Sequence, residues 1–288
     1  MLFLRRIYLG LAILRQSIRY AIPFTRHPLK SSMVRSLIRG AVHAFANRDF
    51  RELRTSVFQH PVQSPAPELA IHPFDLAHGT DTSGLIRGEN LPTGHRNGLW
   101  STAYYGISPA LLLHLLNTLD IDHQRFTFVD LGSGKGRALL VASRFPFRRI
   151  LGVELSPQLS TVAAANITSF SASCQQCRDI EVRTGDATAI NYPAGPLVLY
   201  LYNPFLAPVL KRCLRNLTHS LANEPREIHL IYVNPTPERF IRRHAPTLRK
   251  QWEQAFSMNE EDILADRVNS TQERVAIYRY LPEPFRFS

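Results

Sequence analysis

The sequence predicts an α/β domain in which helices cover both faces of a mostly parallel sheet. From residue 100 onward, short runs rich in Val, Ile and Leu alternate with segments of helical pattern. Buried strands separated by helices are typical of a parallel sheet. The right-handed crossover rule then favours a doubly wound, Rossmann-like arrangement, here preceded by a basic helical N-terminal extension.

Each expected strand closes on or beside a polar residue. The strands are FTFVDL (126–131), RILGVEL (149–155), IEVRTGD (180–186), PLVLYLYN (196–203) and EIHLIYVN (227–234). Helical patterns lie between them at 137–145, 156–170 and 206–221. Ser108 and Pro109 are typical of a helix start, as N-cap and first helical residue. The run ERVAIYRYL (273–281) can add a final edge strand.

Composition divides the chain into three parts. Residues 1–59 form the basic extension, 60–98 a Pro- and Gly-rich linker able to act as a lid, and 99–288 the α/β domain. The first 60 residues hold eleven basic and two acidic residues, so they carry +9 of the net charge of +11. The remaining body is near neutral, which argues against a uniformly basic nucleic-acid-binding domain.

Residues 1–24 place an apolar stripe beside arginines at helical spacing. This pattern fits a helix packed on its own domain, a helix on an anionic membrane surface, or an organelle-targeting presequence. No run reaches the roughly 18 uncharged apolar residues of a membrane span. We favour the packed helix and a cytoplasmic protein. Membrane association through this helix and import by a presequence are the alternatives.

The three cysteines cannot form a disulfide framework, which indicates a reducing compartment. Cys174 and Cys177 form a C-x-x-C, but no second pair lies near enough to complete four zinc ligands. An ordinary loop pair is therefore favoured over metal or redox chemistry, and no metal site is predicted.

The stretch FVDLGSGKGR (128–137) places three glycines directly after a strand. Glycine at this density is usual where the backbone bends sharply or where a ligand approaches it closely. The stretch lacks the G-x-x-x-x-G-K-[ST] of a P-loop. It also lacks the third glycine of a dinucleotide motif, because Arg137 stands at that position. The remaining pattern is D-x-G-x-G-x-G, beginning at Asp130.

Four polar side chains end four consecutive strands: Asp130, Glu154, Asp186 and Asn203. Ligands of open α/β sheets bind beyond the carboxyl ends of the strands. We therefore expect these four side chains to converge on one crevice.

This pattern resembles the class I S-adenosylmethionine-dependent methyltransferases over roughly residues 100–280. The resemblance implies S-adenosyl-L-methionine as the cofactor, with Glu154 accepting from the ribose hydroxyls and Asp186 facing the adenine. The glycine loop would approach the methionine portion, and Asp130 would orient its amino-acid end. The implied cofactor-binding residues are Asp130, Gly132, Ser133, Gly134, Gly136, Glu154, Asp186 and Ala187.

The segment LYNPFL (201–206) resembles the [DNS]-P-P-[YF] loop of nitrogen methyltransferases, with one proline instead of two. Asn203, Pro204 and Phe205 are then the implied catalytic residues: Asn203 would accept N–H bonds and Phe205 would wall the substrate. The alternative is a proline that ends a strand beside a helix N-cap. The motifs are also similar to DOT1-type protein-lysine methyltransferases. A protein lysine or a small amine is accordingly favoured over nucleic acid as acceptor.

An ammonium acceptor must lose a proton before attack. No dedicated base is evident, although His78 and His229 are available residue types. Residues 79–84 and 100–106 can cover the cofactor with Tyr104 or Tyr105, but packing of these tyrosines in the core is favoured. The competing functions are an NAD-type oxidoreductase, disfavoured by Arg137, and a non-catalytic binding or assembly protein tethered by its basic N-terminus.

Overall fold

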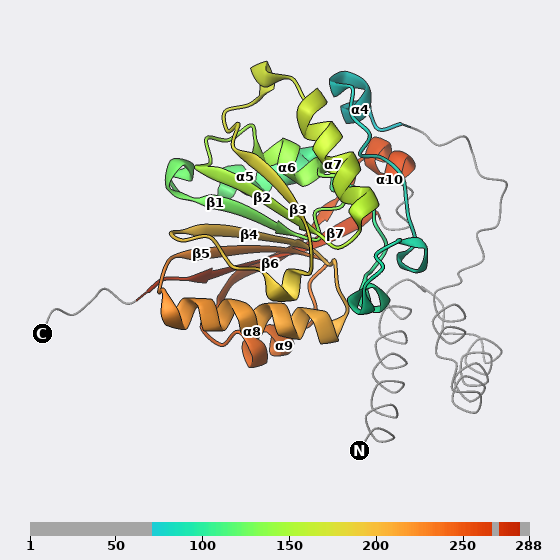
Figure 1. The fold of residues 1–288 in the computed structure, drawn as a ribbon. Coiled ribbons are helices and arrows are strands. Elements are labelled where there is room, and N and C mark those ends of the chain that lie inside the picture. Colours follow the sequence, from blue (N-terminus) through green and yellow to red (C-terminus); the bar gives the residue numbers. More distant parts are fainter. Residues whose placement is uncertain (1–70, 267–270, 283–288) are drawn as a thin grey trace, which may run out of the picture. The chain divides into compact units, whose positions relative to one another are not determined.

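The computed structural model describes residues 71–266 and 271–282, which lie in one compact unit spanning residues 67–288. Seven strands form one sheet in the order β3-β2-β1-β4-β5-β7-β6 (Figure 1). The strands are β1 (Thr127–Leu131), β2 (Arg149–Glu154), β3 (Ile180–Thr184), β4 (Leu197–Tyr202), β5 (Ile228–Val233), β6 (Arg249–Ser257) and β7 (Gln272–Tyr280). The first five are parallel, which confirms the mostly parallel, doubly wound fold.

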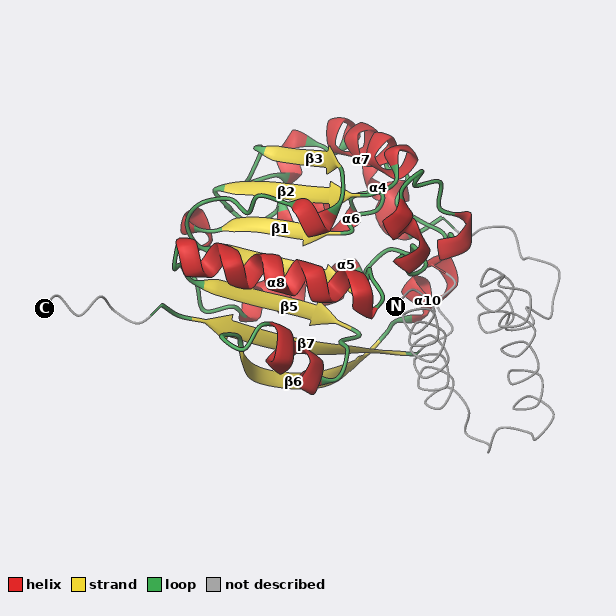
Figure 2. Ribbon diagram, turned by 60° about the horizontal axis from the view of Figure 1, so that its bottom comes forward, coloured by secondary structure: helices red, strands yellow, loops and turns green. Residues whose placement is uncertain are grey.

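Helices cover both faces of the sheet. On one face, α5 (Pro109–Thr118) and α6 (Arg137–Ala142) bury their apolar residues against Phe128 and Tyr200. On the other face, α8 (Ala207–Asn223) and α9 (Glu238–His244) bury theirs against residues such as Leu199 and Leu230, and Figure 2 shows α8 in front of the sheet, running nearly along its strands. The remaining helices are α4 (Pro73–His78), α7 (Pro157–Ser169) and α10 (Glu260–Asp266).

Serine caps begin two of these helices. The Ser108 hydroxyl accepts the N–H of Leu111 at 3.3 Å, and Pro109 occupies the first position of α5. Ser156 caps α7 in the same way, before Pro157. A side-chain cap satisfies a backbone donor that has no partner within the helix. The predicted helix start at Ser108 and Pro109 is confirmed.

The C-terminal strands differ from the prediction. The run 273–281 was expected to form an edge strand, but β7 lies between β5 and β6 and pairs antiparallel with both. The edge belongs to β6, for which no strand was predicted. Its side chains are mostly exposed, and only Trp252 and Phe256 pack partly against the core. Because β6 is an edge strand with mostly exposed side chains, its sequence lacks the continuous apolar run by which buried strands are recognised.

The predicted extension 1–59, including its packed-helix, membrane and presequence interpretations, lies outside the described residues. The boundaries at 59 and 98 stay predictions. The described part of the linker, 71–98, packs on the sheet domain, where Asp75 is buried beside Arg137. Within 71–266 and 271–282, no helix combines the length and apolarity that a membrane span requires.

Candidate active site

A pocket opens where β1, β2 and β4 end, at the predicted edge of the sheet. It encloses about 860 Å³ of empty space, a volume that includes the open solvent at its mouth. Nine of the predicted site residues line it: Asp130, Gly132, Ser133, Gly134, Glu154, Asp186, Ala187, Pro204 and Phe205. Gly136 and Asn203 lie beside it without lining it.

The glycine loop leaves β1 through three residues in the left-handed region, with φ of +89°, +55° and +88° at Gly132, Gly134 and Gly136. A Cβ on Gly132 would lie 2.5 Å from the Cβ of Pro204, and one on Gly134 would lie 2.3 Å from the Tyr104 ring. Gly136 instead faces Ala163 of α7, at 3.2 Å. The first two glycines therefore allow close approach across the pocket, and the third lets α6 begin beside α7.

Glu154 holds the glycine loop through its carboxylate. Its Oε2 accepts the N–H of Gly134 at 2.9 Å, and its Oε1 accepts the N–H of Ser156 at 2.8 Å. Burial raises the pKa of Glu154, and these backbone bonds oppose the rise. A carboxylate oxygen has two acceptor positions. The backbone of Leu155 also bonds to this carboxylate, so about one of its four acceptor positions stays free for a ligand.

Asp130 is the most strongly perturbed acid of the pocket. It is 3% exposed at the end of β1. Burial, reinforced by the negative charge of Glu154, raises the pKa of Asp130 well above its usual range. Two buried carboxyls beside each other favour a cationic ligand, because a positive charge relieves their mutual repulsion.

Asp186 begins a short 3₁₀ turn, Ala187–Ala189, beyond β3. Its carboxylate accepts the N–H and hydroxyl of Thr188 and the side-chain amide of Asn97, the last at 2.7 Å. Burial alone would raise the pKa of Asp186, but these hydrogen bonds lower it. Three donors leave about one acceptor position free. Asn97 also accepts from Arg212 of α8, a link that the sequence did not indicate.

The segment Asn203–Phe205 follows β4 and pairs with residues 100–102. The hydroxyl of Thr102 donates to the Asn203 carbonyl at 2.7 Å, and Phe205 forms an antiparallel bridge with Ser101. Asn203 has a φ of +41°, unusual for a residue other than glycine. Its side-chain Oδ1 is buried and has no hydrogen-bond partner among the described residues. Its backbone carbonyl, the other expected acceptor, is already bonded to Thr102.

The wall beside this segment contains residues that sequence reasoning missed. Tyr202 lines the pocket, and its hydroxyl donates to Glu273 of β7, which is fully buried. The second oxygen of Glu273 accepts the side-chain amide of Asn234. Burial raises the pKa of Glu273, and Asp262 adds to the rise. A local pattern cannot reveal this cluster, because its members come from β4, β5 and β7.

Tyr104 and Tyr105 also line the pocket, so the favoured assignment of these residues to the core was wrong. They precede α5 and face the glycine loop from outside the sheet. The Tyr104 hydroxyl donates to the Thr82 carbonyl at 2.6 Å, and Lys135 lies 5.7 Å from its ring centroid. The Tyr105 ring lies 5.1 Å from that of Tyr202. The sequence feature that could have indicated their place in the pocket wall was a pair of aromatic residues within a polar loop.

Arg137 lines the pocket and holds the chain around residue 82, which lies outside the pocket lining. Its side chain is almost fully buried; its Nε donates to the Thr82 hydroxyl at 2.7 Å, and its guanidinium lies 3.9 Å from the Asp75 carboxylate. Asp75 also accepts from the backbone and hydroxyl of Thr82. The residue that breaks the dinucleotide motif thus fixes the chain around residue 82 against α6.

The remaining candidate residues lie away from the pocket. His78 contacts Arg144, and His229 contacts Glu227, so neither lines the site. Cys174 and Cys177 are free thiols. Among residues 71–266 and 271–282, no group of His, Cys, Asp and Glu is arranged to hold a metal ion.

A family model described as histone methylation protein DOT1 matches residues 97–180. The match includes the glycine loop and Glu154 but ends before Asp186 and Asn203. It covers less than a third of the chain, so the similarity to DOT1 enzymes themselves stays a resemblance. No curated protein matches the sequence significantly.

Solved methyltransferase structures resemble the fold at low identity. An RNA methyltransferase from Salinibacter ruber, in complex with S-adenosyl-L-homocysteine, is 18% identical with a TM-score of 0.38, covering 64% of this chain and 97% of that one. Geranyl diphosphate C-methyltransferase from Streptomyces coelicolor A3(2) is 13% identical with a TM-score of 0.41, covering 60% and 77%. TrmN from Thermus thermophilus is 16% identical with a TM-score of 0.44, covering 61% and 49%. Similarities this weak say nothing about the acceptor.

The pocket fits S-adenosylmethionine on its own chemistry. Glu154 keeps about one acceptor position for a ribose hydroxyl, and the Ser133 hydroxyl is buried without a partner among the described residues. Asp130 and Glu154 favour a cation beside bare glycine backbone. With the DOT1 match on the same loop and the seven-stranded sheet, these features favour a methyltransferase over an NAD-type oxidoreductase. The glycine loop and Glu154 lie within the match to the DOT1 model, and the sheet has the mostly parallel order expected from the resemblance to class I S-adenosylmethionine-dependent methyltransferases.

Proposed function

We propose that this protein is an S-adenosylmethionine-dependent methyltransferase that acts on a nitrogen atom, with a protein lysine or a small amine as the acceptor. The observation that carries the proposal is the Asn203 side-chain oxygen, buried without a partner beside the pocket wall of Pro204 and Phe205. Leaving a buried acceptor unpaired costs about 1–3 kcal/mol, a cost that an incoming N–H group removes. A carbon acceptor would bring no such donor.

The walls of the pocket support a cationic amine. Tyr105, Tyr202 and Phe205 present aromatic rings, which attract ammonium groups over their faces. The acids of the wall are Asp130, Glu154 and Asp186. Arg137 is the only cationic residue among the described residues that line the pocket, and it faces Asp75.

In this proposal the cofactor lies along the carboxyl ends of β1, β2 and β3. Asp130 and the loop of Gly132, Ser133 and Gly134 would hold its amino-acid end, with Gly136 shaping the loop from behind. Glu154 would bind the ribose hydroxyls, and Asp186 with Ala187 would face the adenine. When bound, S-adenosylmethionine supplies the electrophilic methyl group. The protein positions the acceptor in line with that group and keeps water away from it.

Asn203 would then orient the amine by accepting one N–H bond, so that the nitrogen lone pair points into the pocket. Phe205 and Pro204 would form the pocket wall against which the acceptor packs. The Tyr202 hydroxyl, which donates to the Glu273 carboxylate, would lie beside the amine when the amine loses its proton. Glu273 touches neither substrate nor cofactor in this scheme, so it is a positioning residue.

Two measurements test the proposal in order. Calorimetric titration with S-adenosylmethionine, S-adenosylhomocysteine and NAD, beside a Glu154→Ala variant, tests the cofactor site; we expect the first two to bind and the variant to lose that binding. Transfer of labelled methyl groups is then measured to Nα-acetyl-lysine amide, poly-L-lysine and RNA. Label on the lysine compounds supports the proposal. Label on RNA alone contradicts it.

A further inference from the structure

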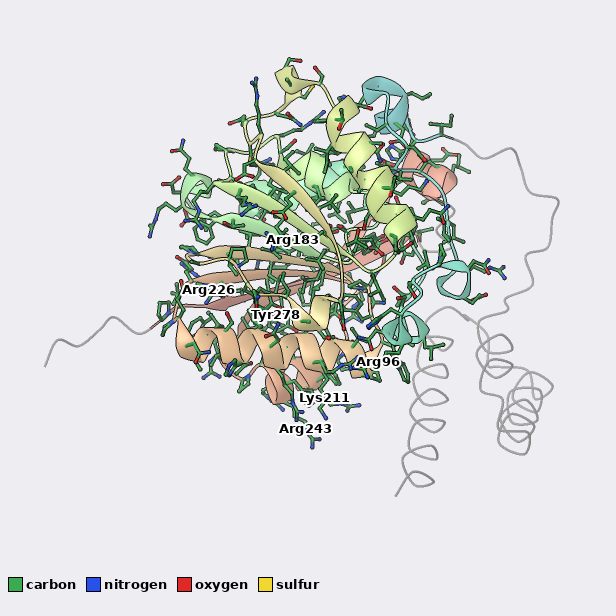
Figure 3. The ribbon with its side chains drawn as sticks, in the orientation of Figure 1. Arg96, Arg183, Lys211, Arg226, Arg243 and Tyr278 are labelled. Carbon is green, nitrogen blue, oxygen red and sulfur yellow. The ribbon has the colours of Figure 1, made fainter. Side chains whose placement is uncertain are left out.

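A group of cationic side chains extends over three elements on the side of the sheet covered by α8 and α9. We call it the basic surface; its members are Arg96 of the 3₁₀ turn Arg96–Trp100, Lys211 and Arg215 of α8, and Arg239, Arg242 and Arg243 of α9. All are exposed except Lys211, which is half-buried. Figure 3 shows Arg96, Lys211 and Arg243 on the same side of the domain, away from Arg183.

The basic surface has almost no countercharge. Helix α8 contains no acidic residue, and the one acid of α9, Glu238, pairs with Lys250. No salt bridge joins any of the six cations to an acid within the described residues. Lys211 and Arg215 are four residues apart, a spacing at which like charges destabilise a helix. This repulsion between like charges destabilises the folded protein unless an anionic ligand binds there.

Three of these cations lie close enough together to shift the pKa of the same histidine. Burial is the largest cause of the lowered pKa of His244 in α9. The positive charges of Lys211, Arg215 and Arg243 lower that pKa further. The Thr218 hydroxyl donates to the His244 carbonyl at 3.3 Å and joins the two helices there. The positive charges of α8 and α9 are thus close enough to add, which raises the local affinity for a polyanion.

The basic surface begins at the rim of the pocket. Next to Arg96, the Asn97 side chain donates to Asp186 and accepts from Arg212 of α8. Three residue positions before Arg212 on the same helix, Val209 contributes to the pocket wall. A long anionic ligand on α8 would therefore pass the mouth of the pocket.

We propose that the basic surface binds the phosphate backbone of a nucleic acid and holds it beside the methyl-transfer pocket. Five of the six cations are arginines, whose planar forks bind phosphate oxygens in pairs. A lipid bilayer would also require apolar side chains to insert. The large exposed apolar residues lie elsewhere, apart from Leu99: Ile71, Leu76, Leu85, Leu264 and Leu281.

This inference is independent of the acceptor, because it concerns docking and not the methylated atom. It also refines the expectation from net charge. Residues 61–288 carry only +2 in total, but that average conceals a face on which six cations gather without acids.

The test is binding of the full-length chain to a labelled DNA duplex of about 30 base pairs over a range of salt concentrations. The variant Lys211→Ala/Arg215→Ala/Arg243→Ala removes three charges from the basic surface. The matched control Arg125→Ala/Arg178→Ala/Arg183→Ala removes three exposed charges elsewhere. All chains keep residues 1–70, so the contribution of that region is common to them.

We expect the basic-surface variant to weaken binding at least about tenfold and to reduce the slope of log affinity against log salt by about 2–3, near 0.9 per lost phosphate contact. The control should change neither quantity appreciably. Equal weakening by both variants, or by neither, overturns the proposal. Release of the basic-surface variant from phosphatidylserine vesicles, with duplex binding unchanged, would assign the surface to lipid. Competition by poly-L-glutamate equal to that by DNA would assign it to an acidic protein.

Discussion

The two sides of the pocket are built in different ways. Most of the cofactor side, from Asp130 to Glu154, comes from one stretch of chain that presents glycine backbone and carboxylates, and Asp186 with Ala187 completes it from beyond β3. The acceptor side joins Tyr105, Tyr202 and Glu273, which belong to three separate segments. A contiguous stretch shows its chemistry in residue spacing, whereas an assembled wall becomes visible only when the sheet brings its strands together.

The two sides also differ in how their polar groups are satisfied. On the cofactor side, both oxygens of Glu154 and of Asp186 accept hydrogen bonds from the protein. On the acceptor side, the Asn203 side-chain oxygen and the Tyr200 hydroxyl are buried without partners among the described residues. Buried polar groups are rarely left so. A ligand would therefore complete the hydrogen bonding of the acceptor side at Asn203 and Tyr200, and that of the cofactor side at the Ser133 hydroxyl.

The largest expected effect comes from closing the approach to the glycine loop. We predict that Gly134→Ala lowers affinity for S-adenosylmethionine about 100-fold or more, or about 2.7 kcal/mol. The new Cβ would strike the Tyr104 ring, 2.3 Å away, and push it or the loop from its place. Calorimetric titration measures the loss.

Gly94→Ala is the matched control. Gly94 has a φ of +59°, close to the +55° of Gly134, but a Cβ there would meet nothing within 4 Å. Both substitutions carry a backbone cost of about 1–2 kcal/mol for an L-residue in this region. Only the substitution at Gly134 should affect the ligand, and Tyr104→Ala in the same chain should restore part of the affinity. Equal loss in both single variants would mean that backbone strain alone is responsible.

A smaller effect is expected on the acceptor side. Glu273→Gln should reduce turnover roughly 100-fold, because the Tyr202 hydroxyl loses the carboxylate that holds it in place, while affinity for S-adenosylhomocysteine changes less than about twofold. Because burial raises the pKa of Glu273, wild-type turnover should fall as pH drops through that raised value. The variant should lack this acidic limb. Turnover with the lysine acceptor is measured against pH.

Glu253→Gln on the neighbouring strand β6 serves as the control, since Glu253 pairs with Arg274 and Lys250 and does not line the pocket. It should leave the pH profile unchanged. A Glu273→Gln variant whose turnover falls by the same factor at every pH would show that Glu273 only stabilises the fold.

The differences between the two sides of the pocket explain which parts of the fold and the site could be predicted from the sequence. It predicted the parallel strands, the cap at Ser108 and nine residues of the pocket wall, because each depends on local pattern or on strand ends meeting at one edge. It missed β6, whose exposed side chains carry no buried pattern. It also missed Glu273 and the roles of Arg137 and Tyr104. Their contacts join residues far apart in the chain, and spacing along a sequence does not encode such contacts.

The smallest effect we predict is a pH dependence of cofactor binding set by Asp130. Burial and the charge of Glu154 raise the pKa of Asp130 in the ligand-free protein, so its stabilising contribution is present at low pH and lost as pH rises through that raised pKa. A cationic ligand favours the ionised carboxyl. Affinity for S-adenosylmethionine should therefore increase with pH in this window, by at most about tenfold per pH unit.

Asp130→Asn should flatten that dependence, and its unfolding free energy should not show the loss of stability with rising pH that the wild type shows. Calorimetry across the acidic to neutral range, with denaturant unfolding of both proteins, measures the two slopes together. A wild-type affinity independent of pH would mean that Asp130 keeps one protonation state throughout. The cofactor side would then bind S-adenosylmethionine through its shape and through Glu154, without a contribution from the charge of Asp130. The two sides of the pocket would in that case differ in geometry more than in charge.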